Sequence, residues 1–349
     1  MKIVSIVGAR PQFIKLAPLS ELLSDDHNEL IVHTGQHYDY LMSEKIFSDL
    51  GIRKPDFHLG IGSGSHAAQT GEMMKGLEQI MIKEKPGLVI VFGDTNSTLA
   101  GALAASKLNI PVLHIEAGLR SYNKSMPEEI NRIVTDHVSD YLFAPTDSAA
   151  GILKSEGLEE ITYMTGDIMV DTIRKSLSLA LENFNSPIIT DLKNTPYNLL
   201  TLHRNYNVDD PAFLKNILIQ LSELDELIIF PVHPRTRKML NGINFSGSNI
   251  ILAEPMGYLD FIAAEYFSKK IITDSGGIQK EAYILGRPCV TLRTETEWVE
   301  TVTEKWNLLL DPSGNDLCER ILSFSPPQTQ KEIFGRDVAA GMIKLINQF

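Results

Sequence analysis

Residues 87–107, GLVIVFGDTNSTLAGALAASK, decide the fold class of this chain. The stretch opens with the apolar run LVIVF, turns through Gly93 and polar residues, and continues as an amphipathic segment over 95–107. Because the run lacks polar alternation, it predicts a strand that is covered on both faces, which is typical of a parallel sheet between layers of helices. The stretch therefore indicates one strand–turn–helix unit of an α/β fold.

The same alternation runs along the whole chain. Short apolar runs precede helix-like segments in the first half (KIVSIV, ELIVHT, GLVIVFG, PVLHIE, YLFAP and ITYMTG) and in the second (YNLLTLH, LIIFPVH, NIILAE, KIITDSG and PCVTLR). A chain of 349 residues exceeds the size at which one hydrophobic core usually keeps growing. We therefore expect two doubly wound, Rossmann-like domains that face each other across a cleft.

The break between the expected domains lies at residues 183–196, NFNSPIITDLKNTP, which are rich in Asn, Thr and Pro and lack helical periodicity. We predict an N-terminal Rossmann-like domain over residues 1–182 and a C-terminal one over residues 183–330. A last helix within residues 331–349 is expected to pack back on the N-terminal domain.

Composition limits the classes of function. The chain is 43% apolar and 22% charged, as in ordinary folded proteins. Its net charge of -12 argues against nonspecific nucleic-acid binding, which needs a basic surface. The apolar run at the start, within MKIVSIVGARP, is too short for a signal peptide or a membrane span, so we expect a cytoplasmic protein without membrane contact. The cysteines, Cys289 and Cys318, are predicted to be reduced structural thiols.

Polar residues follow six of the predicted strands. The segments are GARPQFIK, GDTNST, EAGLR, HRN, HPRTR and DSGGIQKE. One such segment is explained by helix capping, but six that carry three carboxylates, two histidines and several arginines are not. Since ligands of doubly wound folds bind beyond the carboxyl ends of the strands, these segments indicate a site for an anionic ligand.

The segment DSGGIQKEA, residues 274–282, is suited to a nucleotide. Ser275, Gly276 and Gly277 offer backbone N–H groups at the start of a helix, and no side chain of the glycines blocks a diphosphate. Glu281 lies six residues after Ser275, or roughly 9 Å along a helix, which suits the hydroxyl pair of a ribose. The alternative is an ordinary strand–turn–helix in which Glu281 is solvated and Asp274 is a cap.

Basic groups at other strand ends are candidates for phosphate and substrate contacts. Arg10 follows the first strand and is placed for a phosphate, whereas Lys15 is either a substrate contact or a surface residue of the first helix. His203 and His233 each follow a strand of the second half. We predict a functional role for His203 and treat His233 as a possible substrate contact, with a structural histidine as the alternative for each.

Three carboxylates remain, Asp94, Glu116 and Glu128. Carboxylates that share a site repel one another, which moves some pKa values toward neutrality and suits acid–base catalysis. A metal site is less favoured because the sequence lacks a His or Cys ligand pattern. Helix capping is a further alternative for Asp94 and Glu128, and Glu129 is expected on the solvent side of its helix.

Six ordered motifs identify a resemblance. GARPQFIK, GDTNSTLAG, HIEAGLR, MPEEINR, TLHR and DSGGIQKEA resemble those of the non-hydrolysing UDP-N-acetylglucosamine 2-epimerases, and the resemblance runs from the first residue to about residue 310. It implies a GT-B fold, a UDP-sugar substrate, a homodimer, and no metal or redox cofactor. It also implies a reaction in which UDP is eliminated to give a 2-acetamidoglycal and then added back, with the proton delivered to the opposite face.

The resemblance also implies roles for individual residues. Asp94, Glu116 and Glu128 match the catalytic acids of the family, His203 its essential histidine, and Glu281 its ribose ligand. Which carboxylate is the acid and which is the base stays open. The chemistry explains the need for more than one, because inversion removes a proton from one face and delivers it to the other.

The sequence departs from the common family pattern at several positions. It reads GARPQ where many members read GTRPE, Trp298 stands in place of an Arg, and Glu72 falls where many bacterial members have an Arg linked to allosteric activation. These changes resemble the branch that acts on UDP-2,3-diacetamido-2,3-dideoxy-glucuronic acid, so the exact sugar stays open. A GT-B glycosyltransferase and a non-catalytic nucleotide-sugar sensor are the rival functions, and the three carboxylates argue against the sensor.

Overall fold

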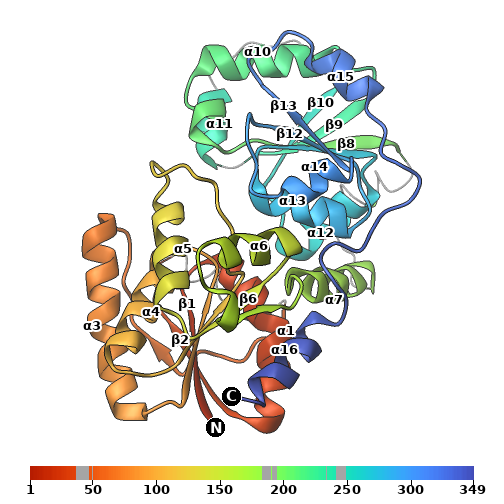
Figure 1. Ribbon diagram of the computed structural model, residues 1–349. Coiled ribbons are helices and arrows are strands. Elements are labelled where there is room, and N and C mark those ends of the chain that lie inside the picture. Colours follow the sequence, from red (N-terminus) through yellow and green to blue (C-terminus); the bar gives the residue numbers. More distant parts are fainter. Residues whose placement is uncertain (37–46, 49, 183–189, 191–194, 233, 241–248) are drawn as a thin grey trace. The chain divides into compact units, whose positions relative to one another are not determined.

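The structure is a computed structural model of residues 1–349, and it describes all of them except 37–46, 49, 183–189, 191–194, 233 and 241–248 (Figure 1). The chain forms two compact units. Unit 1 comprises Met1–Thr172 and Glu332–Phe349, and unit 2 comprises Ile173–Lys331. The division falls within α7 (Met169–Glu182). The break predicted at 183–196 lies largely outside the described residues, so the boundary at residue 182 stays a prediction.

Unit 1 is built on a seven-stranded parallel sheet with the order β3-β2-β1-β4-β5-β6-β7. The strands are β1 (Lys2–Val7), β2 (Asn28–His33), β3 (Phe57–His58), β4 (Leu88–Phe92), β5 (Val112–Ile115), β6 (Tyr141–Ala144) and β7 (Thr162–Met164). Strands β2 and β3 extend the sheet on one side of β1, and strands β4 to β7 extend it on the other side. The carboxyl ends of β1 and β4 therefore form the point where the strand order reverses, which is where doubly wound sheets bind ligands.

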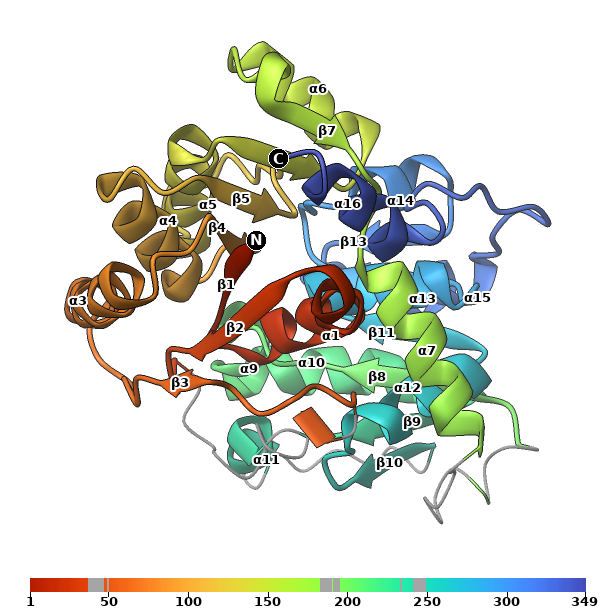
Figure 2. The ribbon, with the colours of Figure 1, turned by 90° about the horizontal axis from the view of Figure 1, so that it is seen from below.

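Helices cover both faces of this sheet. They are α1 (Arg10–Asp26), α3 (His66–Glu84), α4 (Asn96–Lys107), α5 (Pro127–Val138), α6 (Asp147–Ser155), α16 (Val338–Ile346) and the short η1 (Glu159–Ile161). Figures 1 and 2 show α3, α4 and α5 on one face and α1 and α16 on the other. The chain needs a glycine at Gly101 of α4, because a Cβ there would lie 2.7 Å from Ile6 Cδ1 of the sheet. α4 therefore packs closely against β1 and β4.

Unit 2 repeats the architecture with a six-stranded parallel sheet of the order β10-β9-β8-β11-β12-β13. The strands are β8 (Tyr197–Thr201), β9 (Leu227–Pro231), β10 (Ile250–Ala253), β11 (Lys270–Thr273), β12 (Cys289–Leu292) and β13 (Asn307–Leu310). The helices are α9 (Asn205–Val208), α10 (Pro211–Ser222), α11 (Pro234–Leu240), α12 (Tyr258–Phe267), α13 (Gly276–Ile284), α14 (Val299–Thr303) and α15 (Leu317–Ser323). The order reverses between β8 and β11, whose carboxyl ends carry His203 and Asp274.

The core of unit 2 explains why its strands read as continuous apolar runs. Leu200 and Ile272 belong to the cluster on one face of the sheet, while their chain neighbours Leu199 and Ile271 belong to the cluster on the other. All four side chains are fully buried. Since alternate residues of a strand point to opposite faces, both faces must be apolar when both are covered.

The prediction of two parallel α/β domains is confirmed, and each of the eleven apolar runs forms a strand. The sequence missed β3 and β13. Cys289 lies in β12 and Cys318 in α15, and both are free thiols as predicted. Burial raises the pKa of the Cys289 thiol to about 12, which makes it unreactive. In the described part of the chain, every helix falls short of the length and hydrophobicity needed to cross a bilayer.

Candidate active site

The charged groups of unit 1 gather at the carboxyl ends of β1, β4 and β5. Lys15 of α1 forms an ion pair with Glu116, which directly follows β5, and each side chain is only 9% exposed. A Cβ on Gly93 would lie 3.2 Å from both Lys15 Nζ and Glu116 Oε2, and Gly93 has a φ of +62°. A glycine is therefore needed where β4 ends. The alternative that Lys15 is a surface residue is wrong, because its side chain turns inward to the cluster.

Glu116 has a left-handed backbone conformation. Its φ is +72°, a value that costs a residue with a side chain about 1–3 kcal/mol. The turn is fixed by the N–H groups of Glu116 and Ala117, which donate to the Phe143 carbonyl at 3.2 and 3.1 Å. Strain of this kind persists only where the surroundings enforce it, and it gathers at functional sites. The backbone geometry thus agrees with the prediction that Glu116 is a site residue, although five other described residues with side chains, such as Lys85 and Asn109, also have a positive φ.

Asp94 lies beside this pair and is held by Arg132 of α5. Burial raises the pKa of Asp94 above its ordinary value, and the negative charge of Glu116 adds to this effect. The positive charges of Arg132 and Lys15 oppose the rise without cancelling it. Asp94 therefore keeps its proton to a higher pH than an ordinary aspartate, which suits a general acid.

Glu129 corrects a prediction. It was expected on the solvent side of α5, but it is 1% exposed and its carboxylate accepts hydrogen bonds from the backbone N–H groups of Ser121 and Tyr122 at 2.9 and 2.8 Å. It also pairs with Arg132 at 3.0 Å. The reason is the phase of the helix: positions 129, 132 and 136 share its inward face, one turn apart. Glu129 therefore shapes the loop before α5.

Glu128 lies on the exposed side of the same first turn. The N-cap residues of α4 and α5 are Thr95 and Met126, so the capping alternative for Asp94 and Glu128 is wrong. Asp94 lies close enough to Glu116 for the charge of Glu116 to raise its pKa, whereas Glu128 is exposed. The acid–base roles of all three stay predictions.

A buried ion network lies behind these carboxylates. His114 of β5 contacts Asp136 of α5, Asp136 pairs with Arg120, and Arg120 binds Glu156 through two of its nitrogens. Arg120 is 6% exposed, so it serves the protein interior and not a ligand surface. The sequence reasoning missed the roles of His114 and Asp136. The only signal was the motif HIEAGLR, in which His114 precedes Glu116 by two residues.

Arg10 is the first residue of α1 and is partly exposed. The loop before it is fixed by Gln12, which was also missed. The Gln12 carboxamide oxygen accepts hydrogen bonds from Gly8 N and Ala9 N at 2.8 and 3.1 Å. Its Nε2 donates to the Phe92 carbonyl at 2.9 Å. One side chain thus joins the end of β4 to the loop that carries Arg10.

In unit 2, Asp274 follows β11 and orients His203, which lies just after β8. Asp274 is fully buried, and its Oδ1 lies 3.0 Å from His203 Nδ1, while the His203 side chain remains 47% exposed. The backbone N–H groups of His203 and Arg204 donate to the same carboxylate at 3.0–3.1 Å. Burial alone would raise the pKa of Asp274, but the contact with the His203 side chain, followed by the hydrogen bonds from Arg204 N and Asn207, holds it below its usual range. The cap alternative for Asp274 is wrong, since Ser275 is the N-cap of α13.

The start of α13 holds the predicted glycine turn. A Cβ on Gly276 would lie 2.0 Å from Glu297 Oε1, whereas Gly277 has ordinary space around it. Glu297 Oε2 pairs with Arg293 at 3.0 Å. The Glu297 carboxylate therefore lies against the first turn of α13, a position that favours anions. The sequence predicted the anion-binding turn but missed Glu297.

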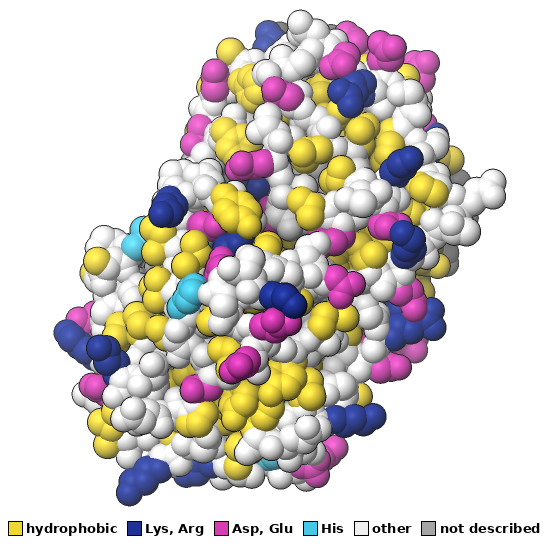
Figure 3. All heavy atoms as spheres, viewed as in Figure 1, with side chains coloured by type: hydrophobic (Ala, Val, Ile, Leu, Met, Phe, Trp, Pro, Cys, Tyr) yellow, Lys and Arg dark blue, Asp and Glu magenta, His cyan; other side chains and the backbone are white. Residues whose placement is uncertain are grey.

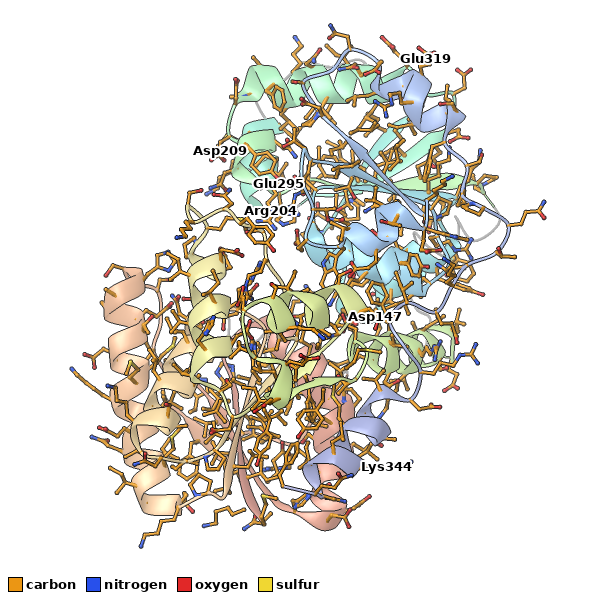
Figure 4. All side chains as sticks on the ribbon, viewed as in Figure 1. Asp147, Arg204, Asp209, Glu295, Glu319 and Lys344 are labelled. Carbon is orange, nitrogen blue, oxygen red and sulfur yellow. The ribbon has the colours of Figure 1, made fainter. Side chains whose placement is uncertain are left out.

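Two further predictions concern unit 2. Glu281 of α13 is 8% exposed, so the alternative of a solvated helix residue is wrong. His233 lies outside the described residues. Figure 4 labels Arg204 and Glu295, which lie in the loops after β8 and β12. On the face that Figure 3 shows, basic side chains are dispersed among acidic ones.

Comparison with known proteins agrees with this geometry. The family model for UDP-N-acetylglucosamine 2-epimerase matches residues 21–346. A UDP-N-acetylglucosamine 2-epimerase homolog of Methanococcus maripaludis is 52% identical over 333 residues, 93% of each chain. The UDP-2,3-diacetamido-2,3-dideoxy-D-glucuronate 2-epimerase of Pseudomonas aeruginosa is 47% identical over 327 residues, 91% of each chain.

A solved structure extends the likeness to the fold. The Methanocaldococcus jannaschii UDP-GlcNAc 2-epimerase, crystallised with UDP-GlcNAc and UDP, is 42% identical with a TM-score of 0.88, and the match covers 100% of this chain and 99% of that one. The expected GT-B fold class is thereby confirmed. This chain belongs to the UDP-N-acetylglucosamine 2-epimerase family.

Proposed function

We propose that this protein is a UDP-sugar 2-epimerase, an isomerase that inverts the carbon bearing the acetamido group. UDP is first eliminated to give a 2-acetamidoglycal and is then added back, while the proton returns to the opposite face. The observation that carries the proposal is the cluster of Asp94, Glu116 and Lys15 in a chain that belongs to this family. A nucleotide-sugar sensor would not need such groups, and a glycosyltransferase would not need two proton-transfer groups at one carbon.

The proton transfers are assigned to unit 1. The hydrogen at the reacting carbon becomes acidic only as the bond to the anomeric oxygen breaks, so the base must already be in position. Glu116 is fixed by Lys15 and by its strained turn, and Asp94 carries a raised pKa. These properties support Asp94 and Glu116 as the two principal proton carriers, with Glu128 as a third candidate from the exposed turn of α5.

The nucleotide is assigned to unit 2. The leaving diphosphate develops negative charge that preorganised donors stabilise. His203, oriented by Asp274, and the N–H groups of Gly276 and Gly277 are proposed for this role. Ser275 is proposed to contact the diphosphate through its side chain, because its own N–H donates to Thr273 Oγ1 at 3.0 Å. Glu281 is proposed to bind the ribose hydroxyls. Arg10 remains the predicted phosphate contact of unit 1, and His233 remains a predicted substrate contact.

The substrate is a UDP-linked 2-acetamido sugar, of the type UDP-GlcNAc or UDP-2,3-diacetamido-2,3-dideoxy-glucuronate. Relatives with both names cover more than 90% of this chain at 44–52% identity. The residues supporting the second sugar are those that depart from the common pattern, such as Gln12 and Trp298. Both sugars are therefore the candidates for assay.

Turnover of each UDP-sugar in D2O tests the reaction. Elimination and re-addition require each epimerised molecule to take its new hydrogen from the protein or solvent, so deuterium should appear at the acetamido-bearing carbon, with traces of glycal and UDP. Mass spectrometry and proton NMR of the product measure this. Epimer formed without deuterium, or no epimer from either sugar, would exclude the proposed reaction.

We further propose that the protein is a homodimer, which the family resemblance implies, and that it is cytoplasmic. Sedimentation equilibrium tests the dimer, and a mass of one chain would refute it. Cell fractionation tests the location.

A further inference from the structure

The ion network behind the unit 1 carboxylates places an oxygen atom next to each ring nitrogen of His114. This residue is fully buried, and its ring nitrogens lie 2.7 Å from Asp136 Oδ1 and 2.7 Å from the Gly93 carbonyl oxygen. The carbonyl can only accept. Asp136 Oδ2 pairs with Arg120 Nη1 at 2.7 Å and accepts from Gly118 N at 3.2 Å, so this carboxylate is held by donors on its other side and also accepts from the ring. Both hydrogen bonds form only if both ring nitrogens carry a proton.

The charge of the ring is balanced within the network. Arg120 Nη1 lies 2.7 Å from Asp136 Oδ2, and Arg120 Nε and Nη2 donate to the two Glu156 oxygens at 2.9 and 2.7 Å. Positive and negative groups therefore alternate from His114 through Asp136 and Arg120 to Glu156. With His114 charged, each cation of the network has an anionic partner, which avoids the large free-energy cost of a buried unpaired charge. At the more exposed end of the network, His137 Nε2 lies 3.1 Å from Glu156 Oε2.

The network contacts the segments that carry the reacting groups. Gly93, the acceptor of one His114 hydrogen bond, directly precedes Asp94. Asp136 Oδ2 also accepts a hydrogen bond from Gly118 N at 3.2 Å, which fixes the turn that follows Glu116. A displacement of the ring would release both segments together.

We propose that His114 is a positioning residue: as an imidazolium, it holds the segments of Asp94 and Glu116 in the geometry needed for proton transfer. The kinetic part of this inference rests on the proposed epimerase function, whereas the charge state does not. Because the ring is fully buried, it contacts no substrate. Its loss should reduce kcat and leave nucleotide affinity unchanged, since displacement of a reacting group by about 1 Å can cost about 100-fold in rate.

The charge state is tested by nitrogen NMR of the whole protein labelled with 15N-histidine. The His114 signals are identified by their absence from the His114→Gln variant. We expect both ring nitrogens to be protonated at neutral pH. A neutral ring with one unprotonated nitrogen would overturn the inference, whether or not the protein proves to be an epimerase.

The positioning role is tested with two amides of matched chemistry. The Nε2 of His114→Gln can replace the donor to Gly93, whereas the Nδ2 of His114→Asn can replace the donor to Asp136. Neither neutral amide replaces both donors, so we expect each variant to lose about 100-fold in kcat, with KM and the UDP dissociation constant unchanged in both. Full activity in either folded variant, or a loss carried by KM, would contradict the positioning role.

Discussion

At the scale of single residues, the two central carboxylates of unit 1 differ in their surroundings. The Asp94 side chain is 30% exposed, and burial of the group raises its pKa, although Arg132 is close. Glu116 is 9% exposed, is paired with Lys15 and lies on a strained backbone. When two neighbouring carboxylates have different surroundings, their pKa values differ. One can then act as an acid while the other acts as a base at the same pH.

This difference leads to a prediction for Asp94→Asn. An amide cannot deliver or take the proton, so kcat should fall about 100-fold or more while the UDP dissociation constant stays the same. Because the pKa of Asp94 is raised, its protonated form persists to a higher pH than for an ordinary aspartate. The kcat of the wild-type protein should therefore fall as rising pH removes this proton. The kcat of Asp94→Asn should not show this decrease with rising pH.

The exposed Asp25→Asn of α1 is the matched control and should leave the whole pH profile unchanged. A variant at Asp94 with full activity would show that another group carries the proton.

The residues of the site differ in how far the sequence could predict them. Asp94 and Glu116 directly follow apolar runs, so their place at the sheet edge could be predicted from the strands alone. Glu129 could not, because the rotation of α5 that buries it and exposes Glu128 is set by packing against the sheet. Asp136 is 22 residues from His114, and only the fold brings the two together.

At the scale of elements, the strand ends of unit 1 are joined by single side chains. Gly8 must be a glycine, because a Cβ there would lie 2.0 Å from Thr34 Oγ1 and 2.2 Å from Ser97 Oγ. Gln12 accepts from the Gly8 loop and donates to Phe92 at the end of β4. The amide is thus used as both acceptor and donor, which a carboxylate cannot match.

We therefore predict that Gln12→Glu destabilises the protein by about 1–3 kcal/mol, the cost of a buried acceptor without a donor. Urea unfolding measures the difference. The defect should shrink as the pH falls, because a protonated glutamic acid can again donate to Phe92. Gln79→Glu, at an exposed position of α3, is the control and should change stability by less than about 0.5 kcal/mol. Equal effects of the two substitutions would contradict the role of Gln12.

The sequence missed two edge strands, β3 and β13. β3 has only two residues, Phe57 and His58, at the sheet edge, and two residues cannot show a periodic pattern. β13 (Asn307–Leu310) is also an edge strand, but it is as long as the predicted strands β11 and β12, so its length does not explain why it was missed. The central strands were predictable because coverage on both faces requires continuous apolar runs.

At the scale of the whole chain, unit 1 is completed by residues from the far end of the sequence. In the last segment, Glu332–Phe349, the Ala339 N–H donates to Asp171 Oδ2 at 2.7 Å, and the Phe349 ring stacks on Tyr141 with ring centroids 3.7 Å apart. The helix of this segment, α16, packs against α1 (Figure 1). Unit 1 is therefore a discontinuous domain whose core depends on both ends of the chain.

The last prediction tests this dependence with Met342→Ala in α16. Met342 is 1% exposed, and truncation of a buried methionine costs about 2–5 kcal/mol. Because the cavity lies in unit 1, native-state hydrogen exchange should accelerate in α1 and β6 and remain unchanged in α10 and α12 of unit 2. Lys344→Ala, on the exposed side of the same helix (Figure 4), removes a longer side chain without opening a cavity and should leave exchange unchanged. Faster exchange confined to unit 2, or equal effects of the two substitutions, would show that the last helix does not support the core of unit 1.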